Sequence, residues 1–314
     1  MRATNLLKFG VTVGIAGLMI VRVPVHALYA ALNGVKPGWL LAALGLVAAM
    51  LAARGYRWHR MLVTGGVTAS PADAARSLAG GFALSLATPG KLGELGRCLF
   101  LEESSRACVL MLNLLDRALD SWALYTYAVL GLLVLSPRPH GVFAFGVWLA
   151  FLPAVMGLPT FISYFDKFPG LPAGLREKIR QAKHRVLEIR VPTFASWAFL
   201  STTIDLLTFY CLLRAFQPVS LFTVLTTFPF ILIVGGLPIA ISGLGPREGV
   251  AAVLLARYAV PSAVAIDATL LLWVFSAVLP AVAGGVWLLV SGASLPRFSF
   301  GADYTAATAE KQSA

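Results

Sequence analysis

The chain has 314 residues, of which 58% are hydrophobic and only 12% are charged. Soluble domains carry about 25% charged residues, so this composition excludes a soluble enzyme and predicts an all-α polytopic membrane protein. The net charge of +11 fits an excess of Lys and Arg in cytoplasmic loops. Because the basic residues lie between apolar tracts and do not form one soluble face, we expect no nucleic-acid partner.

Cysteine and histidine are sparse, with three and four copies respectively. Three cysteines cannot build a disulfide framework, and no Cys-x-x-Cys pair is present. The histidines are scattered along the chain. We therefore expect no metal ion and no cofactor.

The first two predicted spans are 6–23 and 38–53. The first follows Arg2 and Lys8 and resembles a signal peptide, but its apolar run reaches 23 without a convincing cleavage site, so we interpret it as a retained span. The second ends in three arginines mixed with aromatic residues, a composition typical of a membrane interface. Those arginines either anchor the topology or contact lipid headgroups; they are Arg54, Arg57 and Arg60.

A broken stretch, 85–97, follows a short apolar run. Ser70 is a candidate N-cap for a helix that begins at Pro71, and the apolar residues 78–87 are too few to cross a bilayer, which takes about 20. The stretch itself contains a proline, three glycines and Glu94. We predict a re-entrant hairpin that enters and leaves on the cytoplasmic side.

The third span, 107–136, carries charges within its apolar sequence. Asp116 and Asp120 are four residues apart and share a helix face, and Arg117 can reach Asp120. Charges at this depth face protein or water. They form either an internal ion pair that only holds helices together or a polar wall of a translocation cavity.

A fourth span, 141–165, leads into the most basic segment, 166–190, which we interpret as a cytoplasmic loop with an amphipathic surface helix. The fifth span is 191–216. A second broken stretch, 238–249, again combines Pro, Gly, Arg and Glu. The sixth span is 268–291, and the polar tail 292–314 is expected to be disordered.

Placing both termini in the cytoplasm puts every dense basic cluster inside. If 221–258 is a second hairpin, then 38–136 mirrors 192–291 as an inverted-topology repeat. The predicted fold is then a single domain, 1–291, with about six spans and two re-entrant hairpins. The alternative is that 221–240 crosses fully, since it is long enough.

Inverted repeats hold substrate between their halves, near the middle of the membrane. Half-helix N-termini there favour an anionic group such as phosphate, which arginine can bind through two hydrogen bonds. Alternatively, each Glu/Arg set neutralises itself and only fixes the loop. The candidate substrate-binding residues are Pro89, Gly90, Gly93, Glu94 and Arg97 in the first stretch and Gly243, Gly245, Arg247 and Glu248 in the second.

At these residues the chain resembles the lysylphosphatidylglycerol synthase transmembrane-region family. Thr88-Pro-Gly-Lys-Leu-Gly-Glu-Leu-Gly-Arg97 resembles its first signature, and Pro238–Gly249 resembles its second. Asp116-Arg-Ala-Leu-Asp120 and Tyr56-Arg-Trp58 are similar to further family elements. The resemblance implies a lipid-translocating module in a bacterial cytoplasmic membrane. The chain contains no aminoacyl-transferase domain, so the synthase activity is not implied, and Leu271-Leu-Trp273 stands where many relatives place an arginine.

Three functions compete. The first is flipping of an anionic, zwitterionic or isoprenoid-linked lipid. The second is a lipid-headgroup transferase, against which the sequence shows no defensible catalytic motif. The third is a non-catalytic partner of a lipid-modifying enzyme. The expected partners are a phosphate-bearing membrane lipid and either a second copy of the chain or a lipid-biosynthetic enzyme.

Overall fold

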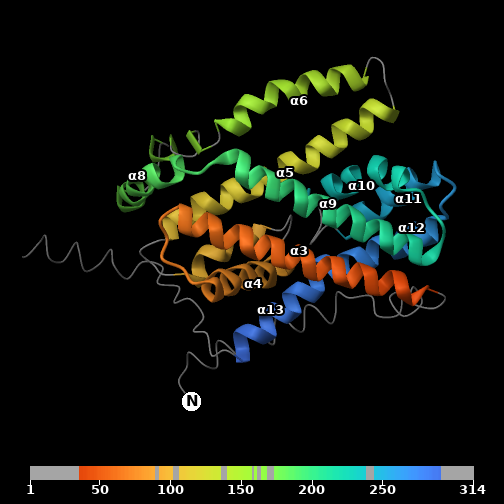
Figure 1. The fold of residues 1–314 in the computed structure, drawn as a ribbon, viewed down its shortest axis with the longest axis horizontal. Coiled ribbons are helices and arrows are strands. Elements are labelled where there is room, and N and C mark those ends of the chain that lie inside the picture. The colour runs from red at the N-terminus through yellow and green to blue at the C-terminus, as the bar shows by residue number, and fades with distance from the viewer. Residues whose placement is uncertain are drawn as a thin grey trace, which may run out of the picture.

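The computed structural model describes residues 35–88, 92–101, 106–135, 140–157, 159–160, 164–167, 173–237 and 244–290. The first predicted span, 6–23, and the tail, 292–314, lie outside these ranges. Throughout the described part of the chain, the regular secondary structure is helical (Figure 1).

The first half contains α3 (Pro37–Thr64), α4 (Pro71–Ala87), the 3₁₀ helix η1 (Leu92–Phe100), α5 (Arg106–Leu135) and α6 (His140–Met156). A 3₁₀ turn, η3 (Tyr164–Lys167), and α8 (Ala173–Leu187) connect it to the second half. The second half contains α9 (Val191–Phe216), α10 (Leu221–Gly235), α11 (Pro246–Ala256), α12 (Ser262–Trp273), a π turn η4 (Val274–Val278) and α13 (Leu279–Val290).

The predicted start of α4 is confirmed. Ser70 has an extended backbone, and its hydroxyl accepts a hydrogen bond from the Asp73 N–H at 3.1 Å. The Asp73 carboxylate in turn accepts from the N–H and the hydroxyl of Ser70. These hydrogen bonds hold the pKa of Asp73 below its usual value. This capping box satisfies N–H groups that the first helical turn would otherwise leave unpaired.

Three described helices are long and apolar enough to cross a membrane: α3, α9 and the continuous segment Ser262–Trp287. By contrast α10 has 15 residues. At 1.5 Å per residue it spans about 22 Å, short of the roughly 30 Å hydrocarbon core. Its length therefore favours a hairpin at 221–258 over a full crossing.

Several predicted boundaries were wrong. The helix α3 does not end at 53 but continues to Thr64, so the arginines expected at an interface are helical. The helix α6 ends at Met156, and residues 159–160 are helical again. The last span begins at Ser262 instead of 268.

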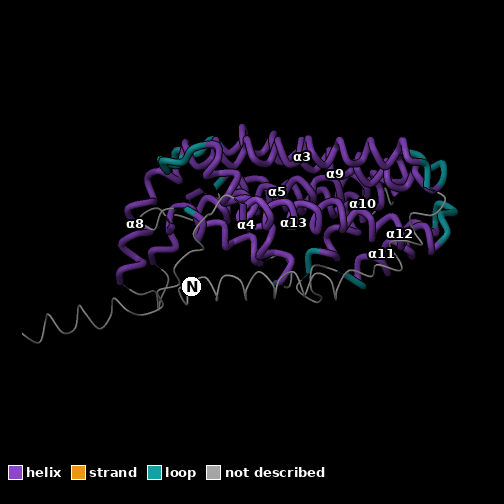
Figure 2. Tube along the Cα trace, turned by 90° about the horizontal axis from the view of Figure 1, so that it is seen from below, coloured by secondary structure: helices purple, strands orange, loops and turns teal. Residues whose placement is uncertain are grey.

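The helices α3 and α9 lie side by side (Figure 2). Contacts at their two ends show that they run antiparallel. At one end, the Lys36 N–H donates to the Ala215 carbonyl at 3.0 Å, and Trp39 packs edge-on against Tyr210. At the other end, Tyr56 contacts the ring of Trp197. Early α3 thus meets late α9, as the predicted opposite membrane directions of these spans require.

Two hydrophobic clusters form the core. The first joins α3, α4, α5 and the start of α9, and the second joins late α9 with α10, α11 and α12. The last membrane segment contributes to both, with Leu271 in the second and Ala281 in the first. The π turn lies between them. Pro280 has no N–H and crowds the carbonyl of Ser276, which explains the widened turn at that point.

Each predicted half packs its hairpin against the last helix of the other half: α4 lies on α13, and α10 lies on α5. The contact between α4 and α13 is close, since a Cβ added at Gly284 would lie 2.8 Å from the Cβ of Ala79. Small residues are what allow membrane helices to approach this closely.

Candidate functional site

The first broken stretch folds back on α4 through Thr88. Its hydroxyl accepts from the Gly93 N–H at 2.6 Å and contacts the Leu84 carbonyl at 3.2 Å. A Cβ added at Gly93 would overlap with the Leu84 carbonyl group. Only glycine at position 93 therefore allows the loop to lie directly against the α4 backbone.

After this turn, η1 directs Glu94 and Arg97 toward α5. Residues three apart are eclipsed in a 3₁₀ helix, so the two side chains share a face, and Arg97 Nη2 pairs with Glu94 Oε2 at 3.1 Å. Both residues are buried, with Glu94 2% exposed and Arg97 1% exposed. Asn113 of α5 donates to the Glu94 carbonyl at 2.8 Å, and Ser77 of α4 donates to the Arg97 carbonyl at 2.9 Å, which fixes the η1 backbone.

Asp116 of α5 lies at the centre of this arrangement. Its two carboxylate oxygens pair with Arg57 Nη2 at 2.8 Å and with Arg97 Nη1 at 2.9 Å. Arg57 also pairs with Asp120 at 2.6 Å. The guanidinium of Arg97 lies 5.2 Å from the ring centroid of Trp58, within cation–π distance.

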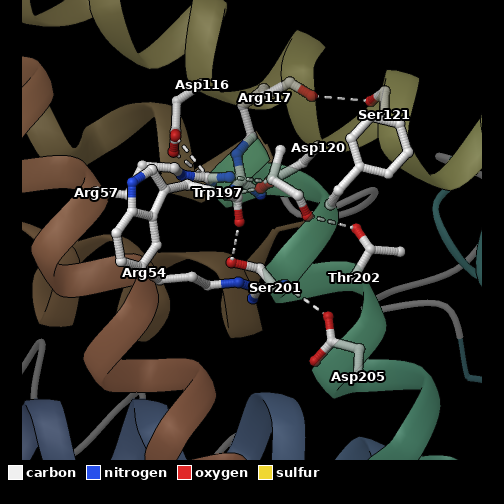
Figure 3. A network of polar contacts seen from close by, with 12 residues as sticks. Arg54, Arg57, Asp116, Arg117, Asp120, Ser121, Trp197, Ser201, Thr202 and Asp205 are labelled. Carbon is white, nitrogen blue, oxygen red and sulfur yellow. Dashed lines mark hydrogen bonds and ion pairs between the residues drawn. The ribbon is translucent and has the colours of Figure 1, made fainter. Parts of the chain in front are cut away.

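Arg117 connects the remaining carboxylates. Its Nη1 lies 2.6 Å from Glu94 Oε2, and its Nη2 lies 3.1 Å from Asp120 Oδ2. Arg54 extends the polar layer from α3 to α9 by pairing with Asp205 at 2.7 Å (Figure 3). Arg117 has the most accessible side chain of the three central arginines, at 27% exposed.

We call the six central side chains the charge network; they are Arg57, Glu94, Arg97, Asp116, Arg117 and Asp120. Three guanidinium groups balance three carboxylates, so the network is neutral. Burying any one of these ions without a partner would cost several kcal/mol, which explains why they are found together.

The second broken stretch is built differently. Gly245 has φ +95°, a conformation that glycine adopts readily, and its N–H donates to Glu248 Oε2 at 2.6 Å. Glu248 also pairs with Arg247 at 2.7 Å, and Arg247 is buried alongside Gly235. Among the described residues, Arg247 and Glu248 form their ion pair with one another. Leu244 packs against the first hydrophobic cluster.

The family model of the lysylphosphatidylglycerol synthase transmembrane region matches residues 5–284. The chain belongs to this family. Its members are membrane domains associated with lipid flipping, and this chain is a membrane-embedded helical domain. A search of curated proteins gave no significant match.

Relative to the expectations drawn from sequence, the structure changes the placement of two of the three arginines that follow the second predicted span. Arg57 was predicted at headgroup level, but it is 1% exposed and lies between two carboxylates. Arg54 is likewise directed inward, toward Asp205. Arg60 is exposed, as a headgroup contact requires. The difference arises from their positions around the axis of α3: residues 54 and 57 lie on its inner face, and residue 60 does not.

The remaining predicted residues divide in three ways. Glu94, Arg97 and the three charges of α5 come together in the charge network, while Arg247 and Glu248 form their own pair. A Cβ added at Gly249 would meet no atom within 4 Å. Pro89, Gly90 and Gly243 lie outside the described residues.

Sequence reasoning missed the interaction partners of Trp58, Ser77 and Asp205. Trp58 was grouped with an interfacial aromatic belt, but it is fully buried against Arg97. The signal for Asp205 was present, since a lone carboxylate in an apolar span needs a partner. Ser77 gave no signal, because a serine in a helix usually bonds to its own backbone.

Proposed function

We propose that this protein translocates a membrane lipid with a phosphate-bearing anionic or zwitterionic headgroup across the bilayer. The observation that carries the proposal is the charge network, three arginines and three carboxylates buried where a membrane hairpin is broken. Family membership supports the same function, because the family is associated with lipid flipping.

The chemistry of the network suits a phospholipid headgroup. Guanidinium groups bind phosphate through two parallel N–H···O hydrogen bonds, and Arg117 is the guanidinium within reach of solvent or headgroup. The carboxylates supply acceptors for an amine of a zwitterionic headgroup. A polar layer of this kind at membrane depth would supply hydrogen-bond and ion-pair partners to a lipid headgroup as the headgroup leaves the water.

The helix packing supports alternating access between two inverted repeats. In the proposed repeat, α3 corresponds to α9, α4 to α10, and α5 to the segment α12–α13. If each helix is replaced by its counterpart in the other repeat, the α4–α13 contact becomes the α10–α5 contact. Both contacts are present in the structure. Rocking of such repeats about a central site exposes that site to each side in turn.

The test is lipid exposure in reconstituted vesicles. Fluorescent phosphatidylglycerol and phosphatidylethanolamine are placed in both leaflets, and a membrane-impermeant reductant then quenches the outer leaflet. Wild-type protein should accelerate quenching of the inner pool. Arg117→Gln should slow it at least about tenfold, because a charge-assisted hydrogen bond contributes about 1.5–3 kcal/mol.

The matched control is Arg180→Gln, on the exposed face of α8, which should keep the wild-type rate. Absence of acceleration for anionic, zwitterionic and isoprenoid-phosphate lipids would overturn the proposed function.

A further inference from the structure

A pocket of about 510 Å³ lies where α6 and α8 end and α9 begins. Figure 1 shows these three helix ends beside one another. None of the residues that line the pocket belongs to the charge network. Pockets that hold small molecules enclose about 300–1,000 Å³, so this one has room for a ligand of that size.

The pocket lies where α6 and α9 are no longer bridged by aromatic rings. Both helices pack on α5, whose Trp122 stacks on Trp148 of α6 and meets Phe199 of α9 edge-on. At 1.5 Å per residue, Trp148 is about 12 Å along α6 from Met156, and Phe199 is about 9 Å along α9 from Thr193. The pocket lies between the two helices on the α8 side of these rings.

The lining of the pocket is mainly apolar. Pro159, Ile189 and Val191 are buried, and the last two belong to the first hydrophobic cluster. Met156 and Leu187 also line the pocket, and both are large apolar side chains that remain exposed. We call Pro159, Ile189 and Val191 the floor of the pocket. Such a lining favours a ligand with an apolar part.

One cation lines the same pocket. Arg190 is exposed and directly precedes α9, which is long and apolar enough to cross a membrane. A basic residue at the end of such a helix lies at headgroup depth. The exposed side chains of Thr160 and Thr193 add hydroxyl groups to the lining. A guanidinium at the depth of lipid phosphates, beside an apolar floor, matches the two parts of a phospholipid.

The α8 side of the pocket is held in place by contacts with the rest of the protein. Arg185 donates to the Gly66 carbonyl at 3.1 Å, and Val186 is fully buried in the first hydrophobic cluster. Leu187 and Ile189 follow directly in the chain. This wall is therefore formed before a ligand arrives, which lowers the entropy lost on binding.

The charge around the pocket favours an anionic lipid over a neutral one. Basic residues outnumber acidic ones between 166 and 190. A basic segment at a membrane surface attracts anionic headgroups within about a Debye length. That attraction raises the local concentration of anionic lipid, and the pocket supplies a defined place for one molecule.

We propose that this pocket binds one anionic phospholipid from the leaflet on the α8 side, with its phosphate on Arg190 and the first part of an acyl chain over the floor. Binding involves hydrogen bonds and apolar contact, so no covalent bond changes. The site is separate from the charge network, and the proposal does not depend on lipid translocation.

The test maps where a photoreactive lipid binds. Phosphatidylglycerol with a diazirine on one acyl chain is added below saturation to the purified protein in detergent and crosslinked by light. Mass spectrometry should place crosslinks on peptides that contain Met156 or Val191. Unlabelled dioctanoyl phosphatidylglycerol should compete at a concentration at least about tenfold lower than dioctanoylglycerol, which has the same chains but no phosphate. Inorganic phosphate, which has no apolar part, should not compete.

Two variants and one matched control locate the binding energy. Arg190→Gln should lower crosslinking at these peptides at least about tenfold, because the charged donor is lost. Thr193→Trp keeps Arg190 but fills the pocket, and it should lower crosslinking as well. Arg180→Gln removes the same charge from the exposed face of α8 and should keep the wild-type yield. The comparison of competitors on wild-type protein stands even if a variant fails to fold.

Several outcomes would overturn the proposal. Equal losses in Arg190→Gln and Arg180→Gln would mean general attraction to the basic segment instead of a site. Equal competition by the two lipids, competition by inorganic phosphate, or absence of crosslinks at these peptides would also exclude it. Crosslinking requires no transport, so this result and the vesicle assay stand or fall separately.

Discussion

Replacing Asp116 with asparagine tests whether the charge network holds the fold together. The substitution keeps the size of the side chain but removes the charge that Arg57 and Arg97 share at 2.8 and 2.9 Å. Both arginines are almost fully buried, and removing one partner from a buried ion pair costs about 3–5 kcal/mol.

The expected loss lies at the low end of this range, about 3 kcal/mol, because each arginine keeps one carboxylate. Arg57 retains Asp120 at 2.6 Å, and Arg97 retains Glu94 at 3.1 Å. At about 2 °C per kcal/mol for a chain of this size, the Tm should fall by about 6 °C.

The assay is thermal unfolding of purified protein in detergent, followed by the loss of the monodisperse size-exclusion peak. Arg180→Gln, which alters an exposed ion pair of α8, is the control and should stay within about 1 °C, since exposed pairs contribute little. A wild-type Tm for Asp116→Asn would refute the argument that these buried ions depend on one another.

Two further predictions concern the backbone. Gly93→Ala should sharply lower the yield of folded protein, because its Cβ would overlap with the Leu84 carbonyl, whereas Gly249→Ala should be tolerated because its Cβ enters open space; equal yields of the two variants would contradict this. Ser70→Ala should destabilise the protein by about 1 kcal/mol at neutral pH through loss of the α4 cap. Because folding lowers the pKa of Asp73, its carboxylate stabilises the folded protein at a pH above the usual carboxyl pKa. This stabilisation disappears as the pH falls through the lowered pKa of Asp73. Thermal scans of wild type and Asp73→Asn should therefore converge at low pH, and a constant gap would exclude this contribution.

The sequence was informative where one residue type had few structural options. Proline and glycine within an apolar tract predicted the break after Ala87, and the spacing of Asp116 and Asp120 predicted a shared helix face. Ser70 followed by proline predicted the start of α4. These inferences depend on local backbone chemistry, which a single sequence contains.

What the sequence could not supply was the rotation of one helix against another. Arg54, Arg57 and Arg60 look alike as an interfacial cluster, yet two of them turn inward because their partners lie on helices far along the chain. Asp205 is 151 residues from Arg54. Nothing in the local sequence distinguishes an arginine that faces headgroups from one that faces a distant carboxylate.

The exchange of packing partners between the halves has a consequence for biosynthesis. The first hydrophobic cluster includes Trp58 near its start and Ala281 near its end, so it cannot close until the ribosome has made the final helix. Until then the face of α4 that Gly284 covers is open to lipid or to membrane chaperones. The first half therefore lacks part of its packing surface until the last helix has been synthesised.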